Sequence, residues 1–391
     1  MSLIQRFLYS YAKHLVVPRV VSARIEHSMS IRLFPGVLFT LAVGALMPFS
    51  AAANTCYWGV GTGPQHYVVN VGALYVPRDA QIGDPIGPID QPFIQGGGGH
   101  SVFCVNDGSA RLTFNASSAV APVPGPIPRR NGMETSGALL QTNIEGVGAR
   151  ITLGTPYDGV TNGYWKLTGP DSSVPFDGYI DFSTPFVLQH SVLRGTVSLV
   201  KTGPIGRGMQ SLDSGRQLVN GSYTGVPNAF GLALSGSVTQ AECTLSANPV
   251  SADPVNLGEW PDSEFTGEGH TTDAVPFTIA LNSCISDPLP GGTVTNAHIR
   301  LDPTAGSATL DAGLGLFSLG SGSTAQGIGI QVLGRDALTP VALETEVLQG
   351  AIPATGGMLL EFNARYYQTG PTSTVMAGSA DGALGFTITY K

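Results

Sequence analysis

Charged side chains are scarce in this sequence. Only 12% of the 391 residues are charged, Lys and Arg together number 19, and no run of them occurs. With a net charge of −8, the chain lacks the basic surface that nucleic-acid binding needs. Glycine (52 residues) and proline (28 residues) are frequent, which argues against long helices. A hydrophobic content of 42% is ample for a packed core and argues against disorder.

Catalytic and metal-binding motifs are also missing. The sequence contains no GxSxG, HExxH or CxxC motif, and its histidines follow no metal-ligand spacing. Asp177 and Asp181 are close enough in sequence to suggest a glycosidase pair, but acids spaced like this in turns are usually solvated or capping residues. We therefore predict that the protein is not an enzyme and uses no metal and no cofactor.

The first 53 residues are typical of an export signal. The apolar stretch over 33–49 follows Arg32 and precedes a run of small residues, as in secretory signal peptides. We predict cleavage before Asn54, with Met29 as an alternative start of translation. The competing interpretation is a membrane anchor, but prolines and glycines interrupt the apolar stretch.

The exported chain contains an even number of cysteines, which in an oxidising compartment predicts two disulfides. The four are Cys56, Cys104, Cys243 and Cys284. Three pairings are possible for four cysteines. Pairing neighbours would place one disulfide in each half of the chain and implies two domains. Each loop closed in this way would stabilise its domain by roughly 4 kcal/mol.

Short alternating runs separated by glycine, proline, asparagine and aspartate recur along the chain and predict strands. They lie at 67–71, 101–105, 111–114, 150–153, 196–200, 277–281, 298–301, 327–332, 358–366 and 385–390. No segment has a sustained helical stripe. We predict an all-β protein of two β-sandwich domains in tandem, spanning 54–236 and 237–391, with the joint near Gly236, where a strand ends and another begins.

The C-terminal segment alternates strictly between an apolar and a polar face. The apolar face comprises Gly378, Ala380, Gly382, Leu384, Phe386, Ile388 and Tyr390. A strand with this pattern needs a partner on each edge, because an exposed apolar edge promotes aggregation. The partner is either an earlier strand of the same domain or a strand from another chain.

These residues, with several upstream motifs, resemble the subunits of chaperone-usher fimbriae. The signature combines the penultimate Tyr390, the alternating run before it and Gly378, fourteenth from the end. The other matching stretches are Cys243 followed by 255–258, Cys284, 327–332 and 362–368. The resemblance implies an immunoglobulin-like sandwich that lacks its last strand. It also implies that a periplasmic chaperone, and later a neighbouring pilin subunit, supplies that strand beside Gly378, Leu384, Phe386, Ile388 and Tyr390.

The segment before the first cysteine is short in the exported chain, since only Asn54 and Thr55 precede Cys56. A subunit of this kind has no strand to donate, so we expect it at the fimbrial tip. Residues 54–236 are similar to the receptor-binding domain of type 3 fimbrial adhesins, at 104–107 and 200–205. The resemblance implies a two-domain tip adhesin, as in type 1 and type 3 fimbriae.

Such an adhesin would be exported through the periplasm, assembled by an outer-membrane usher and displayed at the cell surface. It would bind a host glycan, a matrix protein or an abiotic surface, and the sequence does not choose among these. The alternatives are a tip initiator or adaptor that binds no receptor, and a carbohydrate-active module.

Receptor sites of this class combine an aromatic ring with carboxylates, amides or hydroxyls. The segments 162–166 and 177–181 supply that mixture, and the candidate ligand-binding residues are Tyr164, Trp165, Asp177 and Tyr179. The competing interpretation is that Trp165 and Tyr179 are core residues on adjacent strands.

Overall fold

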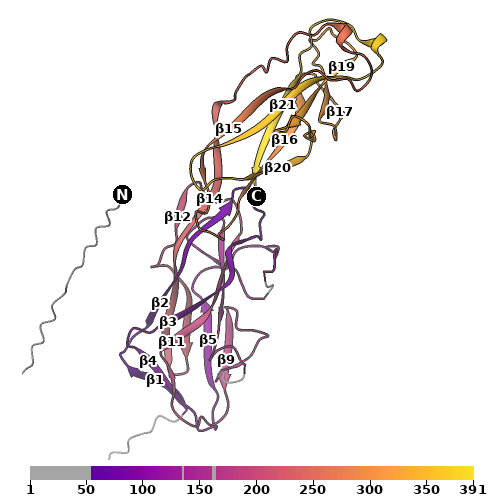
Figure 1. Ribbon diagram of the computed structural model, residues 1–391. Coiled ribbons are helices and arrows are strands. Elements are labelled where there is room, and N and C mark those ends of the chain that lie inside the picture. The colour runs from indigo at the N-terminus through magenta and orange to yellow at the C-terminus, as the bar shows by residue number, and fades with distance from the viewer. Residues whose placement is uncertain (1–53, 134–135, 161–163) are drawn as a thin grey trace, which may run out of the picture. The chain divides into compact units, whose positions relative to one another are not determined.

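A computed structural model describes residues 54–133, 136–160 and 164–391. The predicted export signal, 1–53 with its alternative start at Met29, lies outside these residues. The described chain is almost entirely strand and turn, with two single-turn 3₁₀ segments, which confirms the all-β prediction (Figure 1). None of the described helical segments is long and apolar enough to cross a membrane.

The N-terminal sandwich has its own hydrophobic core, formed by residues between 56 and 238. One sheet runs β2-β14-β13-β5-β9-β8, a second runs β3-β11-β7-β6, and a small third sheet runs β1-β4-β10. The core lies between them because inward residues such as Leu232 of β14 and Ile151 of β7 belong to one cluster. Its strands are β1 (Thr55–Val60), β2 (Gln65–Pro77), β3 (Pro85–Gly96), β4 (Ser101–Val105), β5 (Leu112–Ser118), β6 (Leu140–Gln141), β7 (Val147–Leu153), β8 (Lys166–Leu167), β9 (Phe176–Ile180), β10 (Leu188–His190), β11 (Val192–Lys201), β12 (Met209–Ser211), β13 (Gln217–Tyr223) and the first part of β14 (Val226–Val250).

The C-terminal sandwich packs around a second core, formed by residues between 243 and 390. One sheet runs β14-β15-β21-β19-β18-β17 and the other runs β20-β16-β22. Its elements are the end of β14, η1 (Asp262–Glu264), β15 (Val275–Ile285), β16 (Asn296–Thr304), β17 (Thr309–Asp311), β18 (Leu316–Ser318), β19 (Ile328–Gly334), β20 (Glu346–Ala351), β21 (Met358–Gln368), η2 (Thr372–Thr374) and β22 (Ala383–Tyr390). Both predicted sandwiches are therefore present, each with a separate core.

Strand β14 belongs to both sandwiches (Figure 1). Its first part pairs with β2 in parallel and with β13, and its last part pairs with β15. The strand break expected near Gly236 is absent from β14, which runs through this position with a register shift between Ser235 and Ser237. Gly236 has φ +123°, and a Cβ there would lie 2.4 Å from the carbonyl oxygen of Gly72. The Ser-Gly-Ser sequence therefore forms a bulge that lets two backbones approach closely, and not a turn.

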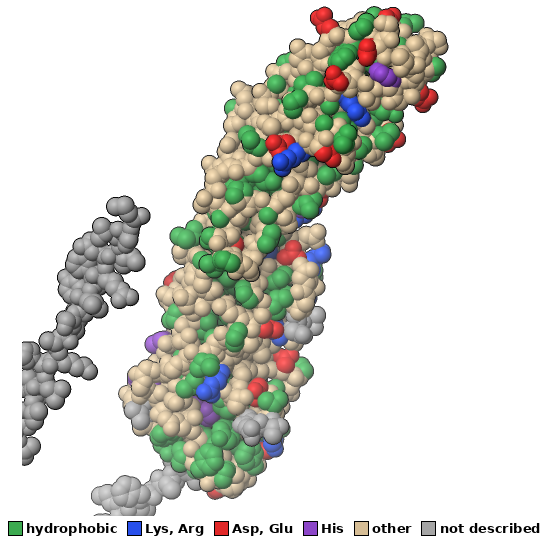
Figure 2. Space-filling view, in the orientation of Figure 1, with side chains coloured by type: hydrophobic (Ala, Val, Ile, Leu, Met, Phe, Trp, Pro, Cys, Tyr) green, Lys and Arg blue, Asp and Glu red, His purple; other side chains and the backbone are tan. Residues whose placement is uncertain are grey.

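Charged side chains are thinly spread over the visible face of the molecule (Figure 2). Lys and Arg appear singly or beside acidic side chains, among uncharged polar and hydrophobic groups. The described residues contain no cluster of three His, Cys, Asp or Glu side chains arranged to hold a metal ion.

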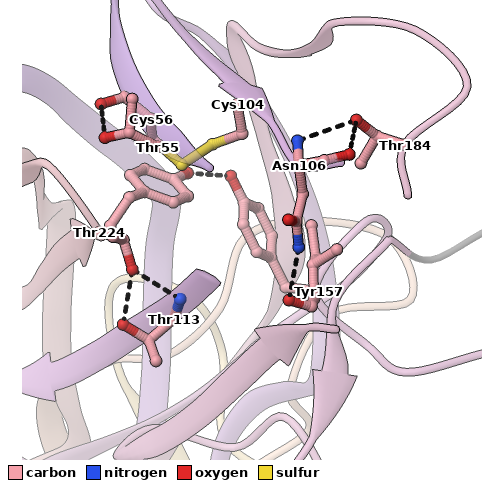
Figure 3. The surroundings of a disulfide bond; sticks show 10 residues. Thr55, Cys56, Cys104, Asn106, Thr113, Tyr157, Thr184 and Thr224 are labelled. Atoms are coloured by element: carbon pink, nitrogen blue, oxygen red, sulfur yellow. Dashed lines mark hydrogen bonds between the residues drawn. A yellow bond between two sulfur atoms is a disulfide. The ribbon is translucent and has the colours of Figure 1, made fainter. Parts of the chain in front are cut away.

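The four cysteines form two disulfides, and of the three possible pairings the structure has the one that joins neighbours in sequence. Cys56 of β1 lies opposite Cys104 of β4 and is bonded to it, and Cys243 of β14 is bonded to Cys284 of β15. Figure 3 shows the first disulfide above the ring of Tyr157, with Asn106 and Thr184 bonded to each other beside it. One covalent link therefore lies in each sandwich.

Candidate functional site

The last strand, β22, presents one apolar face to the C-terminal core. Ile388 and Tyr390 are 7% and 1% exposed, while Leu384 and Phe386 are half-buried and pack against the same cluster. Burial therefore decreases from the end of the strand towards its start. The predicted alternation holds for these four residues, and Leu384 and Phe386 retain apolar surface that nothing in the described chain covers completely.

The backbone of β22 has a partner strand on one edge only. It pairs antiparallel with β16, and the described residues contain no second strand paired with it. Asn296 and Lys391 exchange both backbone hydrogen bonds, at 2.7 and 3.0 Å. Because such exchanged pairs alternate along an antiparallel ladder, the odd-numbered residues of β22 face β16 and the even-numbered residues direct their N–H and C=O groups to the other edge. We call this second side the open edge of β22.

Gly378 lies outside this strand, contrary to the alternation that placed it on the same face as Leu384. The backbone ahead of β22 bonds instead to the loop over 320–326, since the amides of Thr324 and Ala325 both donate to the carbonyl of Ser379 at 3.0 Å. A Cβ on Gly378 would lie 2.4 Å from Thr324 Oγ1. A glycine is needed here because the two segments are in close contact.

A cavity of about 480 Å³ adjoins the segment 375–381. Its other walls combine the aromatic side chains of Trp260, Phe265 and Tyr366 with polar side chains such as those of Asn256 and Asp262. The indole N–H of Trp260 donates to the carbonyl of Leu257 at 2.9 Å, which fixes one wall. The cavity lies beside the segment that leads into β22.

In the N-terminal sandwich, β9 brings two of the four candidate ligand-binding residues to one surface. Phe176, Gly178 and Ile180 face the core, so Asp177 and Tyr179 face outward. The guanidinium of Arg111 covers the Tyr179 ring at 4.2 Å from its centroid. This surface around Tyr179 is called the β9 face below.

Polar pairs surround Tyr179 on the β9 face. Asn115 Nδ2 donates to Asp177 Oδ1 at 2.6 Å, and Lys166 Nζ donates to Asp181 Oδ1 at 2.7 Å. The Lys166 hydrogen bond lowers the pKa of Asp181, and the same bond raises the pKa of Lys166. Asn115, Lys166 and Arg111 were not among the predicted site residues, because the register between β5, β8 and β9 that brings them together cannot be read from spacing.

The other two candidates lie elsewhere. Trp165 is fully buried, with its ring 5.6 Å from those of Phe114 and Tyr223. Tyr164 is half-buried and meets Phe186 edge-on. Of the segment that suggested them, 161–163 lies outside the described residues. The competing interpretation of Trp165 as a core residue is the one that its burial supports.

His190 lies in the same core, against the rings of Tyr157, Trp165 and Tyr223. Burial lowers the pKa of His190 to about 4 and raises the pKa of both tyrosines. Neither ring nitrogen of His190 has a hydrogen-bond partner among the described residues. The cluster is enclosed by core side chains, so it is a packing feature and not a site open to substrate.

Comparison with known proteins places these features in a family. The sequence model described as "Fimbrial protein" matches residues 232–391. The "uncharacterized fimbrial-like protein SfmA" of Escherichia coli strain K12 is 33% identical over 174 residues, which are 44% of this chain and 90% of that protein. The chain belongs to the fimbrial protein family. The resemblance stated from the C-terminal motifs is thereby confirmed.

Solved structures of fimbrial proteins also match this fimbrial chain. The CupB6 tip adhesin of Pseudomonas aeruginosa covers 86% of the chain with 93% of its own length, at 16% identity and a TM-score of 0.31. The receptor binding domain of the adhesin MrkD1P of Klebsiella pneumoniae covers 49% of the chain with its whole length, at 15% identity and a TM-score of 0.28.

Membership of the fimbrial family makes the protein a component of a surface fimbria. The family consists of structural proteins, in line with the prediction of a non-enzymatic role.

Proposed function

We propose that this fimbrial protein is a tip adhesin of the chaperone-usher type. Its C-terminal sandwich would be anchored to the next subunit by a donated strand, and its N-terminal sandwich would bind a receptor. The observation that carries the proposal is the open edge of β22, with half-buried Leu384 and Phe386 beside it.

The open edge is suited to an added strand. Unpaired N–H and C=O groups on an apolar strand favour pairing with another chain, and each hydrogen bond formed contributes about 0.5–1.5 kcal/mol. Apolar side chains of an incoming strand would cover Leu384 and Phe386 and extend towards the cavity beside 375–381. In the cell, a periplasmic chaperone would fill this edge first, and the adjacent pilin subunit would replace it during assembly at the outer-membrane usher.

The position of the family match supports a place at the tip. The residues directly before the pilin-like portion lie in β14 and are paired with β2 and β13 over 226–241. They are therefore held inside a folded sandwich and are not free to complete another subunit. A subunit that accepts a strand but has its upstream residues engaged in this way would end a fibre.

The β9 face supports receptor binding by the N-terminal sandwich. Tyr179 offers an aromatic surface for stacking, and Arg111, Asn115 and Asp177 offer donors and acceptors around it. This combination suits a host glycan or a polar stretch of a matrix protein.

A structural tip initiator without a receptor is the second candidate. The polar groups of the β9 face are already paired with one another, and Arg111 already covers the Tyr179 ring. A surface that satisfies its own hydrogen bonds has less to offer a ligand.

Anchoring is tested by thermal unfolding of the full exported chain with a synthetic peptide of about 15 residues, apolar at alternate positions. We expect the peptide to raise the melting temperature, while a scrambled peptide of the same composition leaves it unchanged. If the chain is fully stable alone and indifferent to the peptide, the proposed anchoring is wrong.

Receptor binding is tested on a glycan and matrix-protein panel. For an adhesin, Tyr179→Ala should abolish saturable binding without lowering the melting temperature by more than a few degrees, because the ring lies outside the core. Tyr57→Ala, a change at a more exposed tyrosine of the same sandwich, is the matched control. Trp165→Ala would report folding, since Trp165 is buried. Absence of saturable binding by the wild-type chain would favour the structural role.

A further inference from the structure

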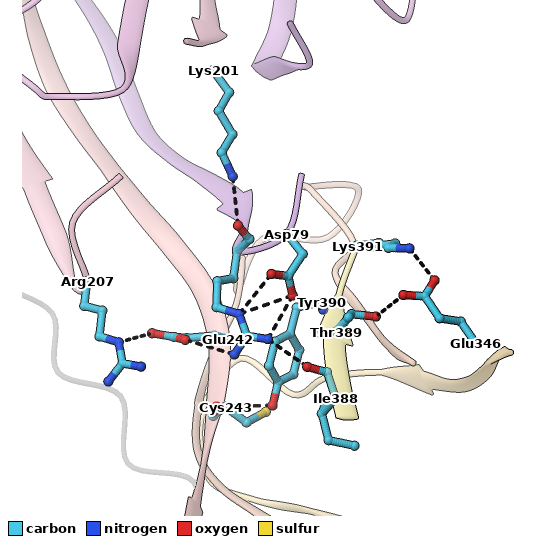
Figure 4. Close-up of polar contacts among 11 residues, drawn as sticks. Asp79, Lys201, Arg207, Glu242, Cys243, Glu346, Ile388, Thr389, Tyr390 and Lys391 are labelled. Carbon is cyan, nitrogen blue, oxygen red and sulfur yellow. Dashed lines mark hydrogen bonds and ion pairs between the residues drawn. The ribbon is translucent and has the colours of Figure 1, made fainter. Parts of the chain in front are cut away.

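The end of the open edge of β22 is already occupied by residues of the N-terminal sandwich. The amide of Tyr390 donates to Asp79 Oδ2 at 2.8 Å, and the carbonyl of Tyr390 accepts from the amide of Asp79 at 3.0 Å. The carbonyl of Ile388 accepts from Arg78 Nη2 at 2.8 Å. Figure 4 shows Asp79 beside Tyr390 at the end of β22, on the side away from Glu346.

The side chain of Tyr390 takes part in the same contact. Its hydroxyl donates to the carbonyl of Cys243 at 3.2 Å, and the Arg78 guanidinium lies 4.6 Å from its ring centroid. The ring is therefore held between the start of the C-terminal core and the Arg78 side chain. Removing the Arg78 side chain, or the hydrogen bond to the Cys243 carbonyl, would loosen the backbone of β22 at Tyr390.

Arg78 and Asp79 are held in place by their own sandwich. The amide of Arg78 donates to the carbonyl of Ala241 at 3.0 Å, and its carbonyl accepts from Lys201 Nζ at 2.8 Å. Asp79 accepts two hydrogen bonds from Arg78 Nε at 3.2 Å and one from its Nη2 at 2.9 Å. Both residues directly follow β2, whose pairing with β14 ends at Pro77 and Ala241. The pair is thus prepositioned by β2, β14 and β11.

A second carboxylate, that of Glu242, joins the charged contact formed by Arg78 and Asp79. Glu242 lies 3.6 Å from Arg78 Nη1 and 3.4 Å from Arg207 Nε, and it is itself mostly buried. We call Arg78, Asp79 and Glu242 the charged corner. The corner lies at the buried end of β22, whereas Leu384 and Phe386 lie at the half-buried end.

We infer that the charged corner is a stop for the incoming strand, that is, the point along β22 beyond which an added strand cannot pair. It occupies the Tyr390 N–H and C=O and the Ile388 C=O, so an added strand can bond only to Leu384, Phe386 and the N–H of Ile388. The inference rests on the proposed strand acceptance by β22. The partner would be an extended segment whose alternate apolar side chains lie over Leu384 and Phe386. Its end beside the charged corner would carry a polar residue.

Backbone hydrogen exchange, resolved by NMR on the full exported chain, tests the stop. Without peptide, the Tyr390 amide should exchange about tenfold or more slowly than the Phe386 amide, because only the former has a partner on this edge. Asp79→Ala should bring Tyr390 to the rate of Phe386. Asp79→Asn retains a side-chain oxygen and should keep most of the protection. The Val197 amide in the N-terminal core is the reference for folding.

The alternately apolar peptide of about 15 residues then locates the end of the added strand. It should slow exchange at Leu384, Phe386 and Ile388 while the Asp79 amide keeps its protection. Loss of protection at Asp79 on peptide binding would show that the strand displaces the corner, and this overturns the stop while leaving strand acceptance intact. If none of the β22 amides is slowed, strand acceptance itself fails and the stop falls with it. An unchanged Tyr390 rate in Asp79→Ala also contradicts the inference.

Discussion

At the scale of single residues, the burial of His190 is a feature with a measurable consequence. Its imidazole packs against Tyr157, Trp165 and Tyr223, and neither nitrogen has a partner among the described residues. The two tyrosines titrate far above neutral pH because burial raises their pKa. Between pH 4 and 7, the imidazole of His190 therefore stays largely neutral in the folded chain, whereas in the unfolded chain it becomes protonated.

We expect the N-terminal sandwich to lose stability in mild acid. The pKa of His190 is about 4 in the folded chain and about 6.5 when unfolded, so the unfolded chain binds a proton first. The contribution is fully present above pH 6.5 and is lost as the pH falls towards 4, by about 3 kcal/mol in total. Denaturant unfolding of the wild type and His190→Phe at several pH values measures it. A phenylalanine variant with the same pH profile would contradict this assignment.

Sequence reasoning named two residues of the β9 face, Asp177 and Tyr179, but not the neighbours that surround them. Period-two alternation places Asp177 and Tyr179 on one face of a strand, and the structure has them there. Trp165 directly precedes Lys166, the first residue of β8, and its side chain is buried in the core. Arg111 reaches Tyr179 only through the pairing of β5 with β9, and strand pairing is a long-range property that no local pattern encodes.

At the scale of elements, β22 has one paired edge and one open edge, and its two faces also differ. Phe386 is half-buried against the C-terminal core, whereas its neighbour Thr387 is exposed. The two side chains provide a matched pair within one strand.

Phe386→Ala should weaken strand capture, because an incoming strand would lose apolar area that it covers, at about 25 cal/mol per Å². Thr387→Ala points away from that area and should have little effect. The measurement is the peptide-induced rise in melting temperature, which should fall in the first variant and persist in the second. Equal behaviour of the two variants would show that the peptide does not lie over this face of β22.

The limits of β22 show why alternation alone overestimates a strand. The pattern extends back to Gly378, but the strand begins at Ala383. Over 378–382 the backbone hydrogen bonds go to the loop around Thr324. Glycine and alanine supply no bulky side chain to fix a register there, so loop contacts decide the local structure.

At the scale of the whole molecule, each sandwich has its own main core and one disulfide. The loops closed by the disulfides span 48 residues in the N-terminal sandwich and 41 in the C-terminal sandwich. Cysteine spacing left three pairings open, and the structure has the one that joins neighbours and keeps each covalent link inside one domain.

Removing one disulfide should weaken its own sandwich more than the other. Replacing Cys243 and Cys284 by serine should cost the C-terminal sandwich about 4 kcal/mol, and the same change at Cys56 and Cys104 should act on the N-terminal one. Hydrogen exchange at core amides of β7, which lies only in the N-terminal sandwich, and of β16, which lies only in the C-terminal one, separates the two effects. Equal loss of protection in both sandwiches would show that they unfold as one cooperative unit.

The number of domains followed from the sequence, but the connection between them did not. The expected joint at Gly236 was based on a cluster of turn-forming residues. In the structure β2 continues alongside β14 past this point, so its hydrogen bonds keep the chain extended. The local composition predicts a turn, but hydrogen bonds to β2, a strand distant in sequence, keep the chain extended.

The continuity of β14 has a mechanical consequence. In the proposed role as a tip adhesin, the subunit would carry tension along its chain, and a slack linker would lengthen before any folded part felt that tension. Here the chain passes from one sandwich to the other as an extended strand, and its hydrogen bonds to β2 run across the strand axis. Tension along β14 is therefore shared by many interstrand hydrogen bonds, which are loaded in shear. Under force, a folded sandwich would be the first part of the chain to unfold.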